Sequence, residues 1–120
     1  TTLFRSMKVM EKIIYEKKNY DVVMGGNDPI ALGCIAAMQM TDKTDQVMVY
    51  GVDGSPDGKA MIKAGFLEGT AAQSPIKIGE KAVQTAYSYL AGETVKKHVT
   101  IPVELITADN LKFYDMTGWQ

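Results

Sequence analysis

The chain has 120 residues, enough for one compact domain or a piece of a larger one, and its 46% hydrophobic content is enough to build a core. Thirteen Lys and Arg against fourteen Asp and Glu give a formal net charge of -1 without any block of one sign, so neither nucleic acid nor an anionic membrane is favoured as a partner. No apolar run approaches the roughly 18 residues of a membrane span, and the single Cys34 lies in an apolar stretch where we expect a small buried residue.

The first element is predicted as an amphipathic helix, because apolar residues recur at helical spacing: Leu3, Met7, Met10 and Ile14. Apolar runs then predict strands at 21–26, 47–52 and 67–72, each followed by a helix, at 29–38, 57–63 and 75–91. A last strand is expected at 99–106, with Pro102 indicating an edge or crossover position. The alternation predicts an α/β fold with a doubly wound parallel sheet.

Three junctions between a strand and the following helix share one design. An apolar strand ends in a polar side chain, a capping residue follows, and a proline takes the first helical position. The predicted caps are Asp28, Ser55 and Ser74. Capping does not require the polar side chains that precede them, which are Asn27, Asp53 and Gln73. Because open parallel sheets bind ligands at the carboxyl ends of their strands, we expect these three side chains to converge in one crevice.

The three side chains suit a ligand with several hydroxyl groups. Asn27 and Gln73 each offer a carbonyl acceptor and two amide donors, and an ionised Asp53 accepts from two directions. Vicinal hydroxyls both donate and accept, so the set is typical of a sugar site. Hydrogen bonding within the loops is the alternative role for the same residues.

Other kinds of site find less support in the sequence. The sequence shows no Ser-His-Asp arrangement: His98 is the only histidine, it lies in a polar loop far along the chain from Asp53, and a surface position is expected. Asp42, Asp45 and Asp57 lack the spacing of a calcium loop, and segment 51–54 lacks the glycine pattern of a phosphate loop. We therefore expect no metal, no cofactor and no enzymatic activity.

A family resemblance is carried by three segments: GGNDPIALGCIAAMQ, VMVYGVDGSPDGKAMIKAG and GTAAQSPIKIGEKAVQTAYSYLAGE. In order, they contain an N-D-x-x-A-L-G helix start, a G-x-D-G-x-P-D-G turn and a T-x-x-Q-x-P junction. The chain thereby resembles ribose-type members of the class I periplasmic binding proteins, the solute-binding components of bacterial ABC sugar importers. The resemblance implies that Asn27, Asp53 and Gln73 hydrogen-bond sugar hydroxyls.

The resemblance also implies two α/β lobes that close on the ligand about a hinge, with this chain as the C-terminal part. Residues 1–73 are then part of the second lobe, 74–101 the helix crossing toward the first lobe, and 102–120 the returning hinge strand and tail. The implied partners are a small-molecule sugar, the transporter permease, and either the N-terminal lobe or a second copy of the chain. The implied location is periplasmic or extracellular and membrane-associated, with the export signal in a longer precursor.

The residue that stacks on the sugar is not identified by the sequence. The family usually places an aromatic just before the first of these helices, where this chain has Thr1 and Thr2. Phe4 is a substitute candidate or a core residue. Three further aromatics could stack on a sugar: Tyr87, Tyr89 and Trp119. Tyr87 falls on the apolar face of its helix, which favours core packing, and Trp119 lies next to the terminus.

Two other functions compete with solute binding. The effector-binding domain of a lactose-repressor-type transcription factor shares this fold and a similar N-D-x-x-A-L-G segment, but the turn after Asp53 resembles that of transport proteins. A small α/β enzyme needs a nucleophile or an acid-base pair, which this sequence does not assemble.

The helix at 75–91 carries an apolar stripe formed by Ile78, Ala82, Val83, Ala86, Tyr87 and Leu90. By the resemblance, this stripe packs on a lobe outside this chain. Large apolar side chains left in water are unfavourable and promote association, so we expect no free monomer with this helix exposed. The missing part of the protein, a second copy of the chain, or the chain's own sheet would cover the stripe.

Overall fold

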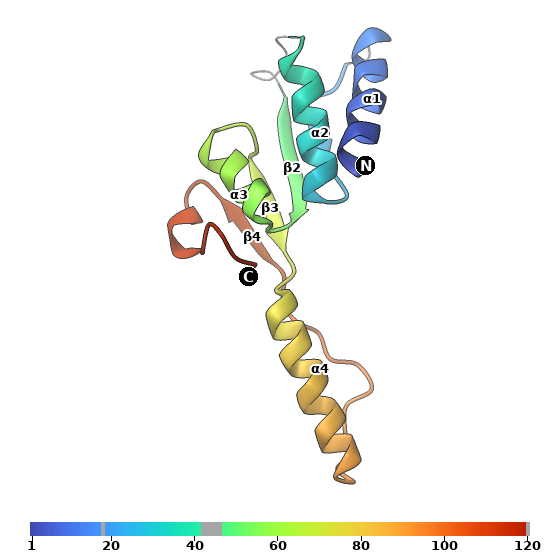
Figure 1. Ribbon diagram of the computed structural model, residues 1–120, viewed down its shortest axis with the longest axis vertical. Helices are drawn as coiled ribbons and strands as arrows, with labels where there is room; N and C mark the ends of the chain where they lie inside the picture. The colour runs from blue at the N-terminus through green and yellow to red at the C-terminus, as the bar shows by residue number, and fades with distance from the viewer. Residues whose placement is uncertain (18, 42–46, 120) are drawn as a thin grey trace.

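The computed structural model of the protein describes residues 1–17, 19–41 and 47–119. Its helices and strands alternate as predicted (Figure 1): α1 (Thr2–Tyr15), β1 (Val22–Met24), α2 (Asp28–Gln39), β2 (Met48–Asp53), α3 (Pro56–Lys63), β3 (Gly69–Ala72), α4 (Pro75–Leu90), β4 (Glu104–Thr107) and the short 3-10 helix η2 (Leu111–Phe113). Every predicted element is present within a few residues of its expected bounds. The largest difference concerns the last strand, since residues 99–103 lie outside it.

The strands form one sheet in the order β1-β2-β3-β4. The first three are parallel, with Val23 beside Val49 and Gly51 beside Thr70. This confirms the predicted α/β class with a parallel sheet. The strand β4 departs from it, because it lies antiparallel to β3 at the edge of the sheet. Figure 1 gives the reason: α4 leads the chain away from the sheet, and the segment after it returns in the opposite direction.

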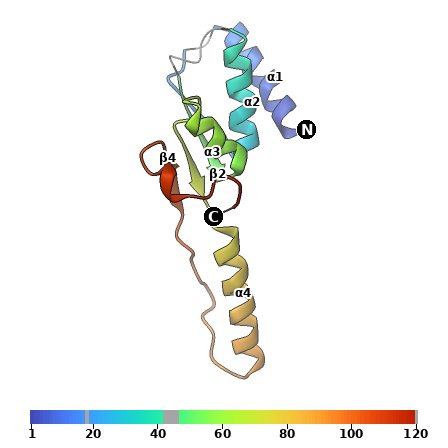
Figure 2. The ribbon, with the colours of Figure 1, turned by 60° about the vertical axis from the view of Figure 1, so that its left-hand side comes forward.

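One face of the sheet is covered by helices. The helix α2 packs on β1 and β2, α3 packs on β3, and α1 packs mainly on α2 (Figure 2). The core between these layers consists mostly of small and branched apolar residues, including Ala31, Ile35, Val49 and Ile106. Cys34 is part of this core, which confirms its predicted burial.

The opposite face of the sheet is apolar and open to solvent. Strand register places Val22, Met24, Met48 and Leu105 on this face, and all four are exposed. A doubly wound sheet has helices on both faces, whereas α2 and α3 cover only one. Within the described residues, one of the two helical layers of the fold class is therefore present.

A buried carboxylate joins the elements at the carboxyl ends of the strands. Asp28 is fully buried, and its side chain accepts hydrogen bonds from the Ser55 backbone N–H at 2.8 Å, the Ser55 Oγ at 2.6 Å and the Thr70 Oγ1 at 2.6 Å. A Cβ atom at Gly51 or Gly58 would overlap this carboxylate, so both glycines leave the space that it occupies. Asp28 thus connects the start of α2 to the start of α3 and to β3.

The helix α4 projects from the rest of the molecule (Figures 1 and 2). The radius of gyration is 17.8 Å, compared with roughly 14 Å for a compact domain of this length. None of the residues of α4 is buried, and its apolar stripe is open to solvent, with Tyr87 72% and Leu90 80% exposed. Gly92, with a φ of 82°, follows the end of the helix, where this conformation favours glycine. The described part of this chain does not cover the stripe.

Replacing Asp28 by Asn should destabilise the fold, because an amide NH2 would face donors that now meet carboxylate oxygens. We expect the free energy of unfolding to fall by about 2 to 4 kcal/mol in urea titrations of the 120-residue chain. Asp57→Asn, an exposed change in the first turn of α3, is the matched control and should change it by less than about 1 kcal/mol. Equal losses in the two variants would contradict the role of Asp28.

The exposed stripe on α4 should make the isolated chain associate. We expect light scattering over a concentration series to give masses above that of the 13.1 kDa monomer. The double variant Tyr87→Lys with Leu90→Lys should shift the masses toward the monomer, and Gln84→Lys on the same helix should not. A wild-type chain that is monomeric at every concentration would show that the stripe needs no partner.

Candidate functional site

The candidate site lies along one edge of the sheet, where the three parallel strands end. The strand β1 ends three residues before Asn27, β2 ends at Asp53, and β3 ends one residue before Gln73. Because these strands are adjacent and parallel, the three residues follow the same edge. The three residues therefore share one edge of the sheet, while their convergence in one crevice and their role in binding stay predictions.

Asn27 has a capping role that the sequence pattern did not assign to it. It is the N-cap of α2, and its Oδ1 accepts a hydrogen bond from the Ile30 backbone N–H at 2.9 Å. The prediction that Asp28 caps this helix is therefore wrong, because its carboxylate is used in the buried network with Ser55 and Thr70. Asn27 is half-buried, and its amide NH2 makes no hydrogen bond to the described residues, which leaves that group available for a ligand.

Asp53 is held in an unusual backbone conformation. It is the last residue of β2, and its φ of 124° lies where side chains other than glycine are disfavoured. The side chain is half-buried beside α2, where the Asp28 backbone N–H donates a hydrogen bond to it. Burial raises the pKa of Asp53, the nearby Asp28 carboxylate raises it further, and the backbone hydrogen bond opposes both. The strain and the raised pKa mark a residue that is not optimised for stability.

Gln73 is exposed at the end of β3, next to the point where the chain leaves the sheet. Ser74 follows with a φ of 51° and is the N-cap of α4, as predicted, but its side chain makes no capping hydrogen bond. The expected capping role of this side chain is therefore wrong. Ser55 does cap α3 as predicted, since its Oγ accepts from the Gly58 backbone N–H at 3.0 Å.

A hollow of about 350 Å³ lies beside Asp53. Its apolar wall is formed by Leu3, Pro29, Leu32, Pro56 and Trp119. Its polar wall is formed by Asp53, Ser55 and Asp57, so Asn27 and Gln73 lie outside it. The sequence named Trp119 as one of several aromatics that could stack on a sugar, but not its place beside Asp53, which depends on the folded tail.

The C-terminal tail is fastened to α3 by a buried lysine. Lys59 is fully buried, and its Nζ donates hydrogen bonds to the backbone oxygens of Asp115 and Gly118, the latter at 2.7 Å. Burial lowers the pKa of Lys59, and the carboxylates of Asp115 and Asp28 oppose this effect. The lysine thus holds the tail residues that precede Trp119.

The side chains at this edge can accept and donate hydrogen bonds, through the carboxylate of Asp53 and the amides of Asn27 and Gln73. His98 is exposed, as predicted for a surface residue. Over residues 1–17, 19–41 and 47–119, no three His, Cys, Asp or Glu side chains form a group that could hold a metal ion. Asp42 and Asp45, named in the sequence analysis, lie outside the described residues, and the expected absence of metals and cofactors stays a prediction.

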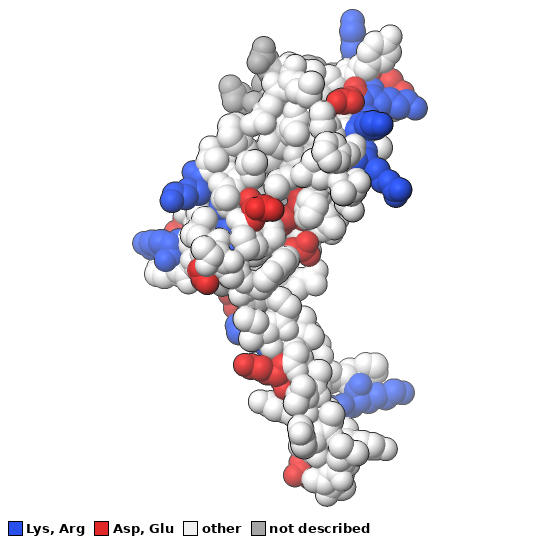
Figure 3. All heavy atoms as spheres, in the orientation of Figure 1, with Lys and Arg blue, Asp and Glu red and all other residues white. Residues whose placement is uncertain are grey.

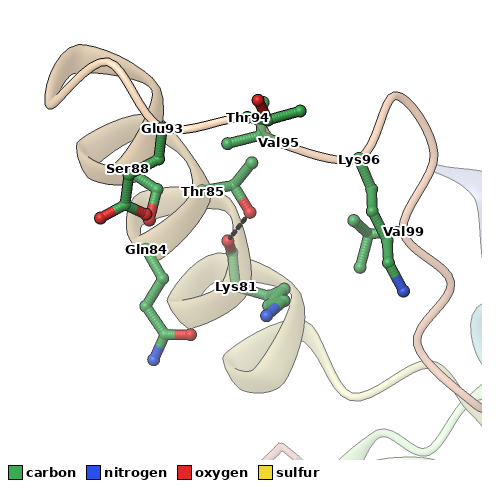
Figure 4. Close-up of a pocket in the computed structure, with 9 residues that line it drawn as sticks. All are labelled: Lys81, Gln84, Thr85, Ser88, Glu93, Thr94, Val95, Lys96 and Val99. Carbon is green, nitrogen blue, oxygen red and sulfur yellow. Dashed lines mark hydrogen bonds between the residues drawn. The ribbon is translucent and has the colours of Figure 1, made fainter.

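Another hollow of about 350 Å³ lies between α4 and the segment after it (Figure 4). Its lining is mostly polar and includes Lys81, Gln84, Thr85 and Lys96, and the Thr85 Oγ1 donates to the Lys81 backbone oxygen. It lies along the projecting α4, away from the edge at which the parallel strands end (Figures 1 and 4). We therefore do not include it in the candidate site.

The surface charge is dispersed. Figure 3 shows acidic and basic side chains separated by a large uncharged surface on this face, in keeping with the net charge of -1. None of the helices described here has the length and apolar character needed to cross a membrane. The expected absence of nucleic-acid binding stays a prediction.

Comparison with curated proteins gives relatives that extend well beyond the length of this chain. The ribose import binding protein of Escherichia coli (strain K12) is 37% identical over 102 residues, or 85% of this chain and 34% of that protein. The ribose import binding protein of Bacillus subtilis (strain 168) is 34% identical over 103 residues, or 86% of this chain and 33% of that protein. The chain therefore spans about a third of the length of these curated relatives.

Solved structures and a family model agree with these relatives. A solute-binding protein of an ABC transporter from Bacillus halodurans C-125 with bound myo-inositol has a TM-score of 0.86 and 33% identity, covering 93% of this chain and 39% of that one. The Caulobacter myo-inositol binding protein has a TM-score of 0.82 and 27% identity, covering 92% of this chain and 38% of that one. The model of the periplasmic binding protein domain matches residues 3–94. The chain belongs to the periplasmic binding protein family.

Proposed function

We propose that this chain is the C-terminal part of the solute-binding component of a bacterial ABC sugar importer. One observation carries the proposal: Asn27, Asp53 and Gln73 stand at the ends of three adjacent parallel strands in a member of this family. Relatives whose names state ribose, allose or myo-inositol binding support a ligand of the monosaccharide or cyclic polyol class.

The three side chains divide the recognition of hydroxyl groups among them. The carboxylate of Asp53 accepts from hydroxyls as a charged acceptor, which makes its hydrogen bonds the strongest of the set. The amide NH2 of Asn27 donates, because its Oδ1 is already used as the cap of α2. The exposed Gln73 both donates and accepts at the end nearest α4.

The proposed arrangement has two lobes. Residues 1–73 belong to the second lobe, 74–101 cross toward the first lobe, and 102–120 return to form the hinge strand and tail. Support comes from the length of the curated relatives, of which this chain covers about a third, and from the exposed stripe on α4. The first lobe, or a second copy of the chain, covers this stripe and closes over the ligand.

The remaining features of the proposal follow from the import role. The partners are a small-molecule sugar and the permease of the transporter, without nucleic acid, and the protein acts in the periplasm or outside the cell, associated with the membrane. Relatives named as import and periplasmic binding proteins favour this role over the repressor alternative. We propose that the chain binds its ligand without chemical turnover, as the names of these relatives suggest.

The proposed function predicts sugar binding that depends on Asp53. In the full-length protein, calorimetry with ribose, allose, fucose and myo-inositol should give saturable binding of at least one of them. Asp53→Ala should weaken it by about 1.5 to 3 kcal/mol for each hydroxyl that the carboxylate binds. Asp53→Gly removes the carboxylate but fits the positive φ, so it should weaken binding equally without adding strain. A wild-type protein that binds none of these ligands would contradict the function, and unchanged affinity in both variants would show that Asp53 only forms the turn.

The raised pKa of Asp53 predicts that its ionised form reduces stability. The folded protein binds the Asp53 proton more tightly than the unfolded chain does, so ionisation of Asp53 lowers the stability of the fold. This loss of stability is complete at neutral pH. It disappears as the pH falls through the pKa of Asp53 in the folded protein and then below the ordinary pKa of an aspartate. Asp53→Asn, which tolerates the same φ, should therefore raise the unfolding temperature at pH 7 and lose this advantage in acid. Thermal unfolding of both proteins across pH measures the difference, and a variant that is less stable at pH 7 would contradict it.

A further inference from the structure

Trp119 follows a tail that is fixed in place although it is close to the end of the chain. The Lys59 ammonium group, buried within the fold, binds the backbone oxygens of Asp115 and Gly118. The Asp115 carboxylate accepts from the Thr117 backbone N–H at 2.9 Å and from the Thr117 Oγ1 at 2.8 Å, which closes a turn. These contacts involve the residues immediately before Trp119, so they fix the backbone to which its indole is attached.

The indole of Trp119 does not belong to the apolar core. It is 49% exposed, and it contacts the hollow beside Asp53 together with Leu3, Pro29, Leu32 and Pro56. A half-exposed tryptophan keeps a large apolar area in contact with water, and a ligand in the hollow would remove part of that area. The hollow therefore joins an apolar wall to a polar wall that contains the carboxylates of Asp53 and Asp57.

This combination matches the two surfaces of a monosaccharide. A sugar ring carries hydroxyls on its periphery and a patch of C–H groups on its face. Binding sites for small ligands are mostly apolar, with a few polar groups that fix the orientation. The Asp53 carboxylate is able to accept from the hydroxyls while the flat indole of Trp119 packs against the C–H face.

We propose that Trp119 is a sugar-contacting residue, supplied by the C-terminal tail and presented to the ligand by Lys59. This inference rests on the proposed function and adds to it a binding group outside the strand ends. The position of this group depends on contacts between residues 56 and 59 positions apart along the chain, which bring the tail to α3.

The test compares three variants of the full-length protein: Trp119→Leu, Trp119→Phe and Phe113→Leu. Phe113 is the matched control, because it is an aromatic of the same tail, is 77% exposed and lies outside the hollow. Calorimetry with the sugar that the wild-type protein binds best among ribose, allose, fucose and myo-inositol should show a loss of affinity of about tenfold or more for Trp119→Leu. Trp119→Phe should retain most of the affinity, and Phe113→Leu should match the wild type.

A second readout separates ligand contact from a structural role of the tail. Trp119 is the only tryptophan in these 120 residues, so the sugar-induced change in fluorescence that is lost in Trp119→Phe reports on this side chain. We expect such a change, with the unfolding temperature of Trp119→Leu within a few degrees of the wild type. Unchanged affinity in Trp119→Leu, or equal losses of affinity and stability in Trp119→Leu and Phe113→Leu, would overturn the inference alone. Absence of sugar binding by the wild type would overturn the proposed function as well.

Discussion

The carboxylate of Asp28 is the interaction on which the geometry of the candidate site depends. It is fully buried, yet donors from the loop before α3 and from β3 surround it. An unpaired charge at this position would be very unfavourable, so the carboxylate requires those donors to stay where they are. By fixing the start of α2 to the start of α3, Asp28 also fixes the two strand ends that carry Asn27 and Asp53. A buried structural group thereby determines the spacing of the neighbouring groups that are proposed to bind a ligand.

The same arrangement explains why Asp53 is unfavourable for the fold. Its carboxylate lies near the negative charge of Asp28, is partly removed from water, and is attached to a backbone with a φ of 124°. Each of these features lowers stability, and residues of this kind gather at binding sites because the surrounding structure holds them there. The network around Asp28 supplies that rigidity. The hydrogen-bonded network of Asp28 therefore allows the fold to tolerate Asp53, an acceptor with a strained backbone and a partly buried side chain.

Local sequence patterns predicted the helices and strands, because apolar periodicity and proline at the first helical turn are local properties. They also predicted that Asn27, Asp53 and Gln73 follow the same sheet edge. They failed where a distant partner decides the role of a residue. In the N-D-P junction either Asn27 or Asp28 can cap the helix. The choice is settled only by the hydrogen bonds of Asp28 with Ser55 and Thr70, which lie 27 and 42 positions further along the chain. The burial of Lys59 and the position of Trp119 likewise depend on contacts between α3 and the tail.

A binding site on one edge of a sheet stays open to water on its other side, which limits its affinity for a ligand. Gln73 is exposed and Trp119 half-exposed, so hydrogen bonds and apolar contacts made there compete with water. A ligand held from one side keeps part of its surface hydrated, and its affinity stays low until a second surface excludes the water. The helix α4, which carries the uncovered stripe, begins directly after Gln73 and Ser74, so the proposed second surface would attach beside the candidate site. In the proposed two-lobe arrangement, docking on α4 and closure over a sugar would be coupled through the same short segment at the end of β3.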